Sequence, residues 1–298
     1  MIELWIPITI LAAFSQNLRS AFQKKLQGKL SGMGATYVRF SYGLPFVFIY
    51  FLLLNYNSNS ILLTNLNFTF FTYCLLGGIS QILATFLLLK MFLRNNFAVG
   101  TAYSKTEPIQ AAFFSLIILN ETISFIGLIG IIVGLIGVLI ISYNRNSFNY
   151  SFFNRSVLLG LLSGTLFGVS AVFFRGASHS LKTSDYVLSS SFTLLVVIFI
   201  QTLLVTIYLL STDKKQLFLT LINWKESIIV GFFGALASLC WFYAMSIQNV
   251  AYVRALGQIE LLFTICVSIL YFKEKIYSNE IIGIIITLAG LYLILIHS

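Results

Sequence analysis

Long apolar runs separated by short polar breaks extend over almost the whole chain. A helix of about 20 apolar residues spans the hydrocarbon core of a bilayer. The apolar runs cover residues 4–22, 34–54, 68–90, 97–119, 123–143, 156–175, 186–210, 226–247, 250–271 and 278–297. The pattern therefore predicts an all-α integral membrane protein with ten transmembrane helices and almost nothing outside the membrane.

One apolar segment occurs twice in the chain. Residues 97–143 align without a gap on residues 250–296 when they are shifted by 153 positions. The matched residues include Ala98 and Ala251, Glu107 and Glu260, Ser115 and Ser268, Glu121 and Glu274, Gly130 and Gly283, and Gly137 and Gly290. Five helices per copy is an odd number, so the two copies cross the membrane in opposite directions. We expect two inverted five-helix repeats, residues 1–148 and 149–298, which together form one transport domain.

Composition agrees with a membrane protein and gives no sign of a cofactor. Of the 298 residues, 58% are hydrophobic and only 9% are charged, unlike a soluble domain. The three cysteines lie inside apolar runs without paired spacing, and two histidines are too few for a metal site. No G-x-x-x-x-G-K loop for nucleotides occurs. We expect no metal and no cofactor, and we attribute the net charge of +9 to membrane topology rather than to nucleic-acid binding.

Lysine and arginine gather in alternate breaks between the runs. Eleven of them lie after the first, third, fifth, seventh and ninth runs: Lys24, Lys25, Lys29, Arg94, Arg145, Arg155, Lys214, Lys215, Lys225, Lys273 and Lys275. The opposite side has Lys182, with Arg175 near it. Because basic residues favour the cytoplasmic side, both termini are predicted to lie outside the cytoplasm.

Two glutamates in the predicted spans are the first candidates for a function. Inserting a charge into the bilayer costs about 2.5–3.5 kcal/mol, so such residues need an explanation. Glu107 and Glu260 are equivalent in the repeat and lie near the middle of their runs. Burial favours the protonated form of a carboxyl group without a partner, so each could exchange a proton during transport. The alternative is an ion pair with Lys105, Arg254 or Arg19 that only fixes helix packing.

The neighbours of the two glutamates differ. Lys105 precedes Glu107 by two residues, so it does not share the same helix face and should reach another helix or a substrate. In the second copy Gln258 replaces Lys105, and Arg254 replaces a threonine. Such asymmetry is expected when one substrate binds to two related halves. Pro108 either interrupts the helix, as in discontinuous transporter helices, or produces a static kink.

Further candidates come from the first two runs and from the aromatic residues. Arg19 and Gln23 share a helix face and are expected to line a cavity. Arg39 is expected to extend to the lipid headgroups, the alternative being a basic vestibule with Arg19. The predicted substrate-binding residues are Arg19, Gln23, Tyr103, Lys105, Glu107, Trp241, Arg254, Gln258 and Glu260, with Glu107 and Glu260 also as proton-coupling residues. Simple packing is the alternative for Tyr103 and Trp241.

Two remaining patterns have structural interpretations. Glycines four residues apart, as at Gly160, Gly164 and Gly168, predict close helix packing or the face of a homodimer. Glu121 and Glu274 are interpreted as first-turn residues of the helices that follow, because a carboxylate there complements the helix dipole.

Several of these motifs resemble a known family. They are Lys105-Thr106-Glu107-Pro108, Asn120-Glu121, the pair Gly130 and Gly137, and their second copies at Glu260, Glu274, Gly283 and Gly290. With them the chain resembles, over essentially its full length, the EamA-like branch of the drug/metabolite transporter superfamily. The resemblance implies a ten-helix basket of two inverted units with a central substrate cavity and alternating access. Members of the family transport amino acids, nucleosides and related metabolites.

Two departures from the superfamily affect this expectation. Small multidrug members have a membrane-embedded glutamate in their first helix, where this chain has Arg19, so drug-cation antiport by that residue does not apply. Ten-helix members are usually drawn with cytoplasmic termini, which disagrees with the charge distribution. Residues 18–24 and 37–40 resemble a narrower bacterial subgroup, which indicates the bacterial inner membrane.

The sequence thus predicts a secondary transporter of a small polar metabolite, such as an amino acid or an organic anion, with proton coupling as a hypothesis. The expected partners are that substrate and the lipid bilayer. The alternative is an integral-membrane enzyme acting on a lipid or prenyl substrate. Such enzymes need clustered acidic or histidine side chains, and Asp185 and Asp213 are isolated, so we expect no enzymatic activity.

Overall fold

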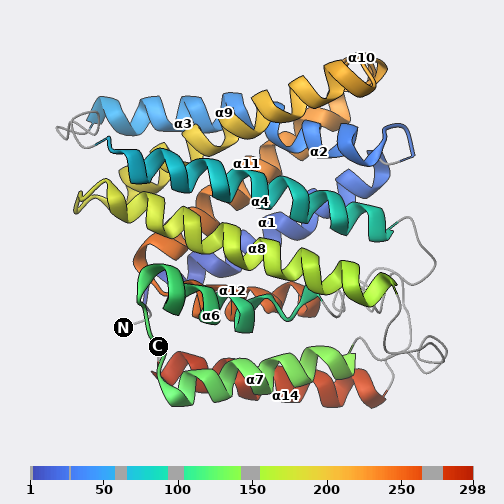
Figure 1. Cartoon of the computed structure of the whole chain (residues 1–298). Helices are drawn as coiled ribbons and strands as arrows, with labels where there is room; N and C mark the ends of the chain where they lie inside the picture. Colours follow the sequence, from blue (N-terminus) through green and yellow to red (C-terminus); the bar gives the residue numbers. More distant parts are fainter. Residues whose placement is uncertain are drawn as a thin grey trace. The chain divides into compact units, whose positions relative to one another are not determined.

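The computed structural model of the chain is built from helices. It describes residues 3–26, 28–57, 66–92, 104–141, 155–263 and 278–297, and no strand occurs in these ranges. The elements (Figure 1) are α1 (Trp5–Leu26), α2 (Gly32–Ser41), α3 (Leu44–Asn57), α4 (Phe68–Phe92), α6 (Glu107–Leu119), α7 (Phe125–Ile141), α8 (Arg155–Ser180), α9 (Tyr186–Thr212), α10 (Lys215–Ile222), α11 (Trp224–Ile247), α12 (Val250–Leu256), the 3-10 helix η2 (Gly257–Ile259) and α14 (Ser278–His297).

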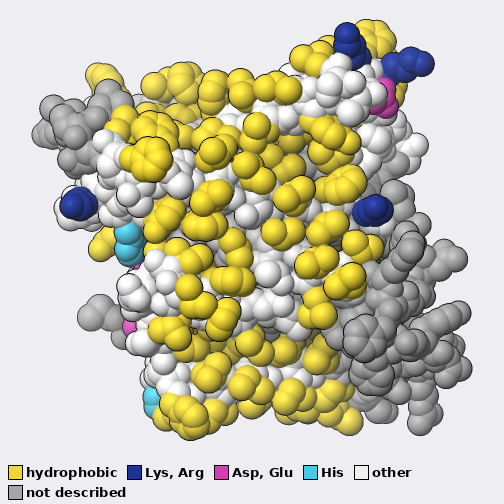
Figure 2. Space-filling model, in the orientation of Figure 1, with side chains coloured by type: hydrophobic (Ala, Val, Ile, Leu, Met, Phe, Trp, Pro, Cys, Tyr) yellow, Lys and Arg dark blue, Asp and Glu magenta, His cyan; other side chains and the backbone are white. Residues whose placement is uncertain are grey.

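The length of the apolar helices and the apolar side chains on the surface are those of a membrane protein. Five helical segments are long and apolar enough to cross a membrane, namely Gly32–Tyr56, Phe68–Leu88, Leu158–Ser180, Tyr186–Thr212 and Trp224–Ile247. Three shorter apolar helices cover Glu107–Leu119, Phe125–Ile141 and Ile281–His297. Large apolar side chains such as Leu83 on α4 and Phe199 on α9 are exposed, and Figure 2 shows hydrophobic side chains over much of the visible face. Soluble proteins rarely expose so much apolar surface.

The second predicted span, 34–54, is two helices rather than one. A turn at Tyr42 and Gly43 separates α2 from α3. Pro45, the second residue of α3, has no N–H to donate to the carbonyl of Ser41, so it is tolerated only in the first turn of a new helix. The structure also contains the short helix α10, which lies in a polar break where the hydropathy pattern predicted no helix.

The fourth predicted span, 97–119, is likewise interrupted. Residues 105 and 106 form a turn, and α6 begins at Glu107 with Pro108 in its first turn. The proline ring would clash with the preceding turn of a continuous helix, so the helix starts here instead. Glu107 is therefore the first residue of α6 and not the interior helix position that the sequence predicted. Of the two alternatives for Pro108, an interrupted helix agrees with the structure.

The connection between α6 and α7 differs from the prediction for Glu121. Asn120 ends α6 in the left-handed conformation with φ of 54°, which asparagine tolerates. Ser124 Oγ accepts a hydrogen bond from the Gly127 amide at 3.0 Å, so the serine caps α7. The prediction that Glu121 starts the helix is thus wrong. It lies in the connection, where its Oε2 accepts a hydrogen bond from Asn249 Nδ2 at 3.2 Å. Its repeat equivalent, Glu274, lies outside the described residues.

Contacts divide the chain into two compact units. Unit 1 comprises Met1–Ile82 and Phe173–Ile247, and unit 2 comprises Leu83–Val172 and Gln248–Ser298. In unit 1, α1 packs on α11, while α2 and α3 pack on α9. In unit 2, α6 packs on α12 and α7 packs on α14. Each unit contains segments from both halves of the sequence, so packing does not follow the repeat boundary at residues 148 and 149.

The helix pair α7 and α14 of unit 2 shows the relation between the two repeats (Figure 1). A Cβ atom on Gly130 would lie 2.9 Å from the carbonyl oxygen of Gly290, and one on Gly137 would lie 2.7 Å from that of Gly283. As these contacts move toward the C-terminus of α7, they move toward the N-terminus of α14. The two helices are therefore antiparallel. Since Gly130 is equivalent to Gly283 and Gly137 to Gly290, equivalent helices run in opposite directions, as expected for an inverted repeat.

Replacing Gly290 with alanine should force α7 and α14 apart. The new methyl group would lie 2.7 Å from both the Gly130 carbonyl oxygen and the Gly134 Cα, which are backbone atoms that cannot move aside. We expect Gly290→Ala to destabilise the protein by about 1–3 kcal/mol and to lower the thermal unfolding midpoint in detergent. Gly134→Ala is the matched control, because its Cβ would lie 3.8 Å from Gln258 Oε1. Equal midpoints for the two variants would contradict this packing.

Candidate functional site

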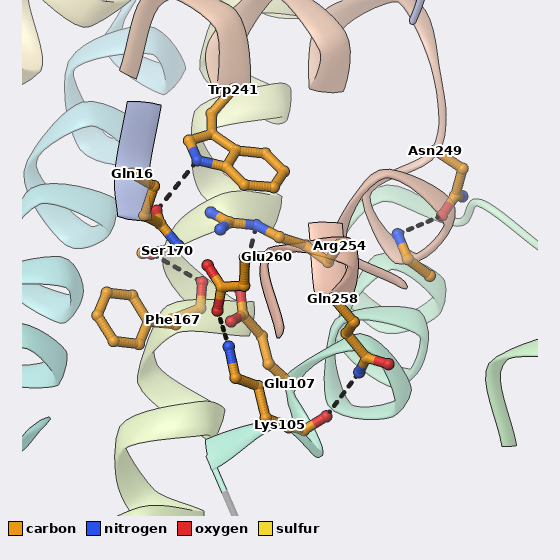
Figure 3. Close-up of polar contacts among 11 residues, drawn as sticks. Gln16, Lys105, Glu107, Phe167, Ser170, Trp241, Asn249, Arg254, Gln258 and Glu260 are labelled. Carbon is orange, nitrogen blue, oxygen red and sulfur yellow. Dashed lines mark hydrogen bonds and ion pairs between the residues drawn. The ribbon is translucent and has the colours of Figure 1, made fainter. Parts of the chain in front are cut away.

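Four charged side chains of unit 2 point toward one another (Figure 3). Lys105 lies in the turn before α6, and Glu107 is the first residue of that helix. Arg254 lies in the last turn of α12, and Glu260 directly follows η2. We call these four residues the charge cluster. Each repeat contributes one cation and one carboxylate to it.

The charge cluster consists of two crossed ion pairs. Arg254 Nε lies 3.1 Å from Glu107 Oε1, and Lys105 Nζ forms an ion pair with Glu260 Oε1. The side chains of Arg254 and Lys105 are only 9% and 22% exposed. Each pair joins a residue of the first repeat to one of the second. Both carboxylates thus have a partner, and in each pair the cation is one that the sequence had suggested.

Helix ends favour the first of these pairs. Glu107 lies at the N-terminus of α6 and Arg254 near the C-terminus of α12. The helix dipole stabilises a negative charge at the first position and a positive charge at the second, each by about 0.3–1 kcal/mol. The start of α12 is fixed by Asn249, whose side chain accepts a hydrogen bond from the Ala251 amide at 2.9 Å. Pro108 and Asn249 thus determine where the two charges lie.

Gln258 fixes the backbone beside the charge cluster. Its Nε2 donates a hydrogen bond to the carbonyl oxygen of Lys105 at 2.9 Å, and its side chain is buried (Figure 3). Because Gln258 is the repeat equivalent of Lys105, two equivalent positions contact each other directly. The glutamine holds the turn from which Lys105 extends toward Glu260.

The candidates in unit 1 make contacts of a different kind. Trp241 Nε1 donates a hydrogen bond to Gln16 Oε1 at 3.1 Å, and Gln23 Nε2 donates one to the carbonyl oxygen of Ala35 at 2.9 Å. The Gln23 side chain therefore links α1 to α2, and Trp241 links α11 to α1. Tyr103, the remaining candidate, lies outside the described residues.

The burial of Arg39 shows that the prediction for this residue was wrong. The sequence favoured an arginine that extends to the lipid headgroups, but Arg39 is 6% exposed, as is Arg19. Both side chains lie against Gly234 of α11, where a Cβ would be 3.5 Å from Arg19 Cδ and 3.7 Å from Arg39 Cγ. A glycine leaves room for the two stems, which explains how both arginines are accommodated inside unit 1.

The sequence interpretation missed two polar residues of unit 2. Gln110 lies one turn after Glu107, and its Oε1 has no hydrogen-bond partner within the described residues. The spacing of three residues would have indicated its common face with Glu107. Asn249 contacts Glu121, and its match with Asn96 in the repeat alignment was the available signal. Among the described side chains, no group of three His, Cys, Asp or Glu residues could hold a metal ion.

Comparison with known proteins identifies relatives of the chain. The model of the EamA-like transporter family matches residues 3–143 and 154–296, one match for each repeat. A crystal structure of a protein superposes with a TM-score of 0.74, covering 97% of this chain and 95% of that chain at 12% identity. At this identity the likeness concerns the fold alone. No curated protein matches the chain.

The two residues of the second ion pair should be energetically coupled. Either Lys105→Met or Glu260→Gln leaves the opposite charge in a largely apolar setting, and we expect each to destabilise the protein by about 1–3 kcal/mol. The double variant should be less destabilised than the sum of the two, by about 1 kcal/mol or more. Thermal unfolding in detergent measures this, with Lys90→Met as the control for an exposed lysine of the same unit. Strictly additive effects would contradict the pairing.

Proposed function

Since the chain belongs to the EamA-like transporter family, we propose that it is a secondary transporter that moves a small polar metabolite across a bacterial inner membrane by alternating access. The family makes it a membrane transporter of the drug/metabolite type. The class of substrate, the driving force and the orientation in the membrane are proposals that go beyond membership of the family.

The observation on which the proposal depends is the charge cluster. Only 9% of the residues of this chain are charged, yet four charged side chains lie together at one place in unit 2. Ion pairs in apolar surroundings give little net stability compared with well-packed apolar side chains, so stability does not account for them. Ionisable groups within membrane helices usually mark the path of a substrate or an ion. The charge cluster is therefore better explained by transport than by folding.

The composition of the charge cluster indicates the substrate class. Two cations and two carboxylates lie within reach of one another, so a solute with a carboxylate and an amine could replace one partner of each pair. Lys105 and Arg254 would bind the carboxylate, and Glu107 and Glu260 would bind the amine or a proton. An amino acid has this chemistry, and an organic anion has part of it. Gln258, which is hydrogen-bonded to the backbone of Lys105, is a further proposed contact beside the charge cluster. Arg19, Gln23, Tyr103 and Trp241 remain substrate contacts proposed from the sequence alone.

The proposed topology follows from charge and symmetry. We assign ten spans in two inverted repeats, with the basic breaks in the cytoplasm and both termini on the opposite side. The lipid bilayer surrounds the exposed apolar side chains. The glycine face of α8 packs inside unit 2 and is not free to form a homodimer, because a Cβ on Gly164 would lie 2.9 Å from the carbonyl oxygen of Ser104.

Proton coupling through the glutamates can be tested by neutralising them. We expect proteoliposomes with the unaltered chain to accumulate a component of a labelled amino-acid and organic-acid mixture faster when a pH gradient is imposed. Glu107→Gln and Glu260→Gln should lose this stimulation by about tenfold or more, because neither amide can exchange a proton. Glu226→Gln is the control, since that carboxylate pairs with Lys29 in unit 1 at 2.8 Å. If both variants kept the rate and pH dependence of the unaltered chain, the coupling role would be excluded.

The orientation can be tested with reporters at the C-terminus. An alkaline phosphatase fusion after residue 298 should be active and a green fluorescent protein fusion dark, because the charge distribution places this end outside the cytoplasm. The same reporters inserted after Lys214 should give the reverse result. A fluorescent, phosphatase-inactive C-terminus would refute the assigned topology and leave the transporter assignment intact.

A further inference from the structure

The short helix α10 connects two membrane-spanning helices of unit 1. The span of α9 ends at Thr212 and the span of α11 begins at Trp224, and both are long and apolar enough to cross a membrane. Between them, α10 covers Lys215–Ile222. Because α10 joins neighbouring ends of two spans through a short connection, it lies close to the surface of the bilayer.

The polar side chains of α10 face the protein. Gln216 and Thr220, which are one helical turn apart, are both buried. Gln216 Oε1 accepts a hydrogen bond from the Ser31 amide at 2.8 Å, just before α2. The carbonyl oxygen of Thr220 accepts one from Tyr42 Oη at 3.0 Å, just after α2. These contacts attach α10 to both ends of α2 and fix which of its faces points outward.

The outward face of α10 is apolar. Phe218, Leu221 and Ile222 are spaced by three and four residues, so they lie on one side of the helix. They are 66%, 63% and 58% exposed, and Trp224, just after α10, is 51% exposed. A helix that faces water has the opposite arrangement, with its apolar side buried and its polar side exposed. The outward face therefore suits the apolar part of a membrane.

Three exposed lysines border this apolar face. Lys214 and Lys215 precede Phe218 by four and three residues, which places them on the same side of the helix. Lys225 is exposed as well, and its Nζ lies 5.8 Å from the ring centroid of Trp224. Basic and hydrophobic side chains gather in Figure 2 at the place where Figure 1 labels α10. We call Lys214, Lys215 and Lys225 the interfacial lysines.

The acidic side chains of this connection leave its net charge positive. Asp213 Oδ2 accepts a hydrogen bond from Gln216 Nε2 at 3.0 Å, which directs this carboxylate toward the buried side of α10. Glu226 Oε1 forms an ion pair with Lys29 Nζ at 2.8 Å, so its charge is balanced by a lysine from another connection. The three interfacial lysines thus outnumber the remaining negative charge, and the surface attracts anions.

From this arrangement we propose that α10 lies in the interface of the bilayer and binds the headgroups of anionic phospholipids through the interfacial lysines. The apolar face enters the zone beneath the headgroups, while the lysine stems extend toward the phosphates. The hydrogen bonds of Gln216 and Thr220 connect this lipid site to α2. The proposal requires a membrane protein and does not depend on the transported solute.

The fluorescence of Trp224 tests where α10 lies. The purified full chain is reconstituted into vesicles of phosphatidylglycerol and phosphatidylcholine, in which one of the two lipids carries bromine, a quencher, on its acyl chains. The quenching that disappears in Trp224→Phe is the part due to Trp224. We expect this part to be larger for bromine near the headgroup than near the chain end. It should also be about twofold or more larger when phosphatidylglycerol carries the bromine, because the interfacial lysines concentrate this lipid.

Variants of the interfacial lysines test the role of charge. A lysine near an anionic surface is worth about fivefold in affinity, so replacing all three with glutamine should abolish the preference for phosphatidylglycerol. Replacing all three with arginine keeps the charge and should keep the preference. Lys182→Asn is the matched control, because it removes an exposed lysine from another connection of unit 1 and should behave as the unaltered chain.

Several results would overturn the proposal. They are equal quenching by the two brominated lipids in the unaltered chain, a preference that persists in the glutamine variant, and a preference lost in the arginine variant. Stronger quenching by bromine near the chain end would place α10 in the hydrocarbon instead. An absence of quenching would show that water or a second copy of the chain covers the apolar face. None of these results affects the proposed transport function, since no solute is involved.

Discussion

The pairing of charges in an apolar environment is the constraint on which unit 2 depends. A charge that has left water needs a partner close by, because breaking such a pair leaves an uncompensated charge and costs several kcal/mol. Glu107 has Arg254 and Glu260 has Lys105, and each partner comes from the other repeat. The charge balance of the site therefore requires α6 and α12 together. The helix starts also contribute to this pairing. Pro108 fixes the start of α6 and Asn249 fixes the start of α12, and these starts determine where the charged side chains lie.

Much of the fold could be predicted from hydropathy and internal repetition. The apolar runs located most of the long helices, and the match of Gly130 with Gly283 anticipated the antiparallel approach of α7 and α14. Helix ends were predicted less well, because they depend on single residues whose effect is local. Pro45 divides a run that is apolar throughout, and Ser124 rather than Glu121 caps α7. Periodicity contains no information on these choices, whereas capping chemistry does.

The residues of the charge cluster could be chosen from the sequence, but the contacts between them could not. The four residues of the charge cluster were all identified from their position in apolar runs, yet which cation faces which glutamate depends on the packing of segments far apart in the sequence. Arg39 illustrates the same limit. Nothing near it in the chain distinguishes a lipid-facing arginine from a buried one, because the room it occupies comes from Gly234 on another helix. Small residues on distant helices determine where long polar side chains can lie.

The departure from symmetry has a physical consequence. A symmetric duplication of the first copy would place a lysine at position 258, whereas the chain has glutamine there and Arg254 one helical turn earlier. The number of cations in the charge cluster is unchanged, but the second one is displaced by four residues and becomes a guanidinium. Gln258 meanwhile anchors the carbonyl of Lys105 at 2.9 Å. The charges stay balanced while their arrangement becomes directional, and a directional arrangement suits a solute with chemically different ends better than a symmetric one.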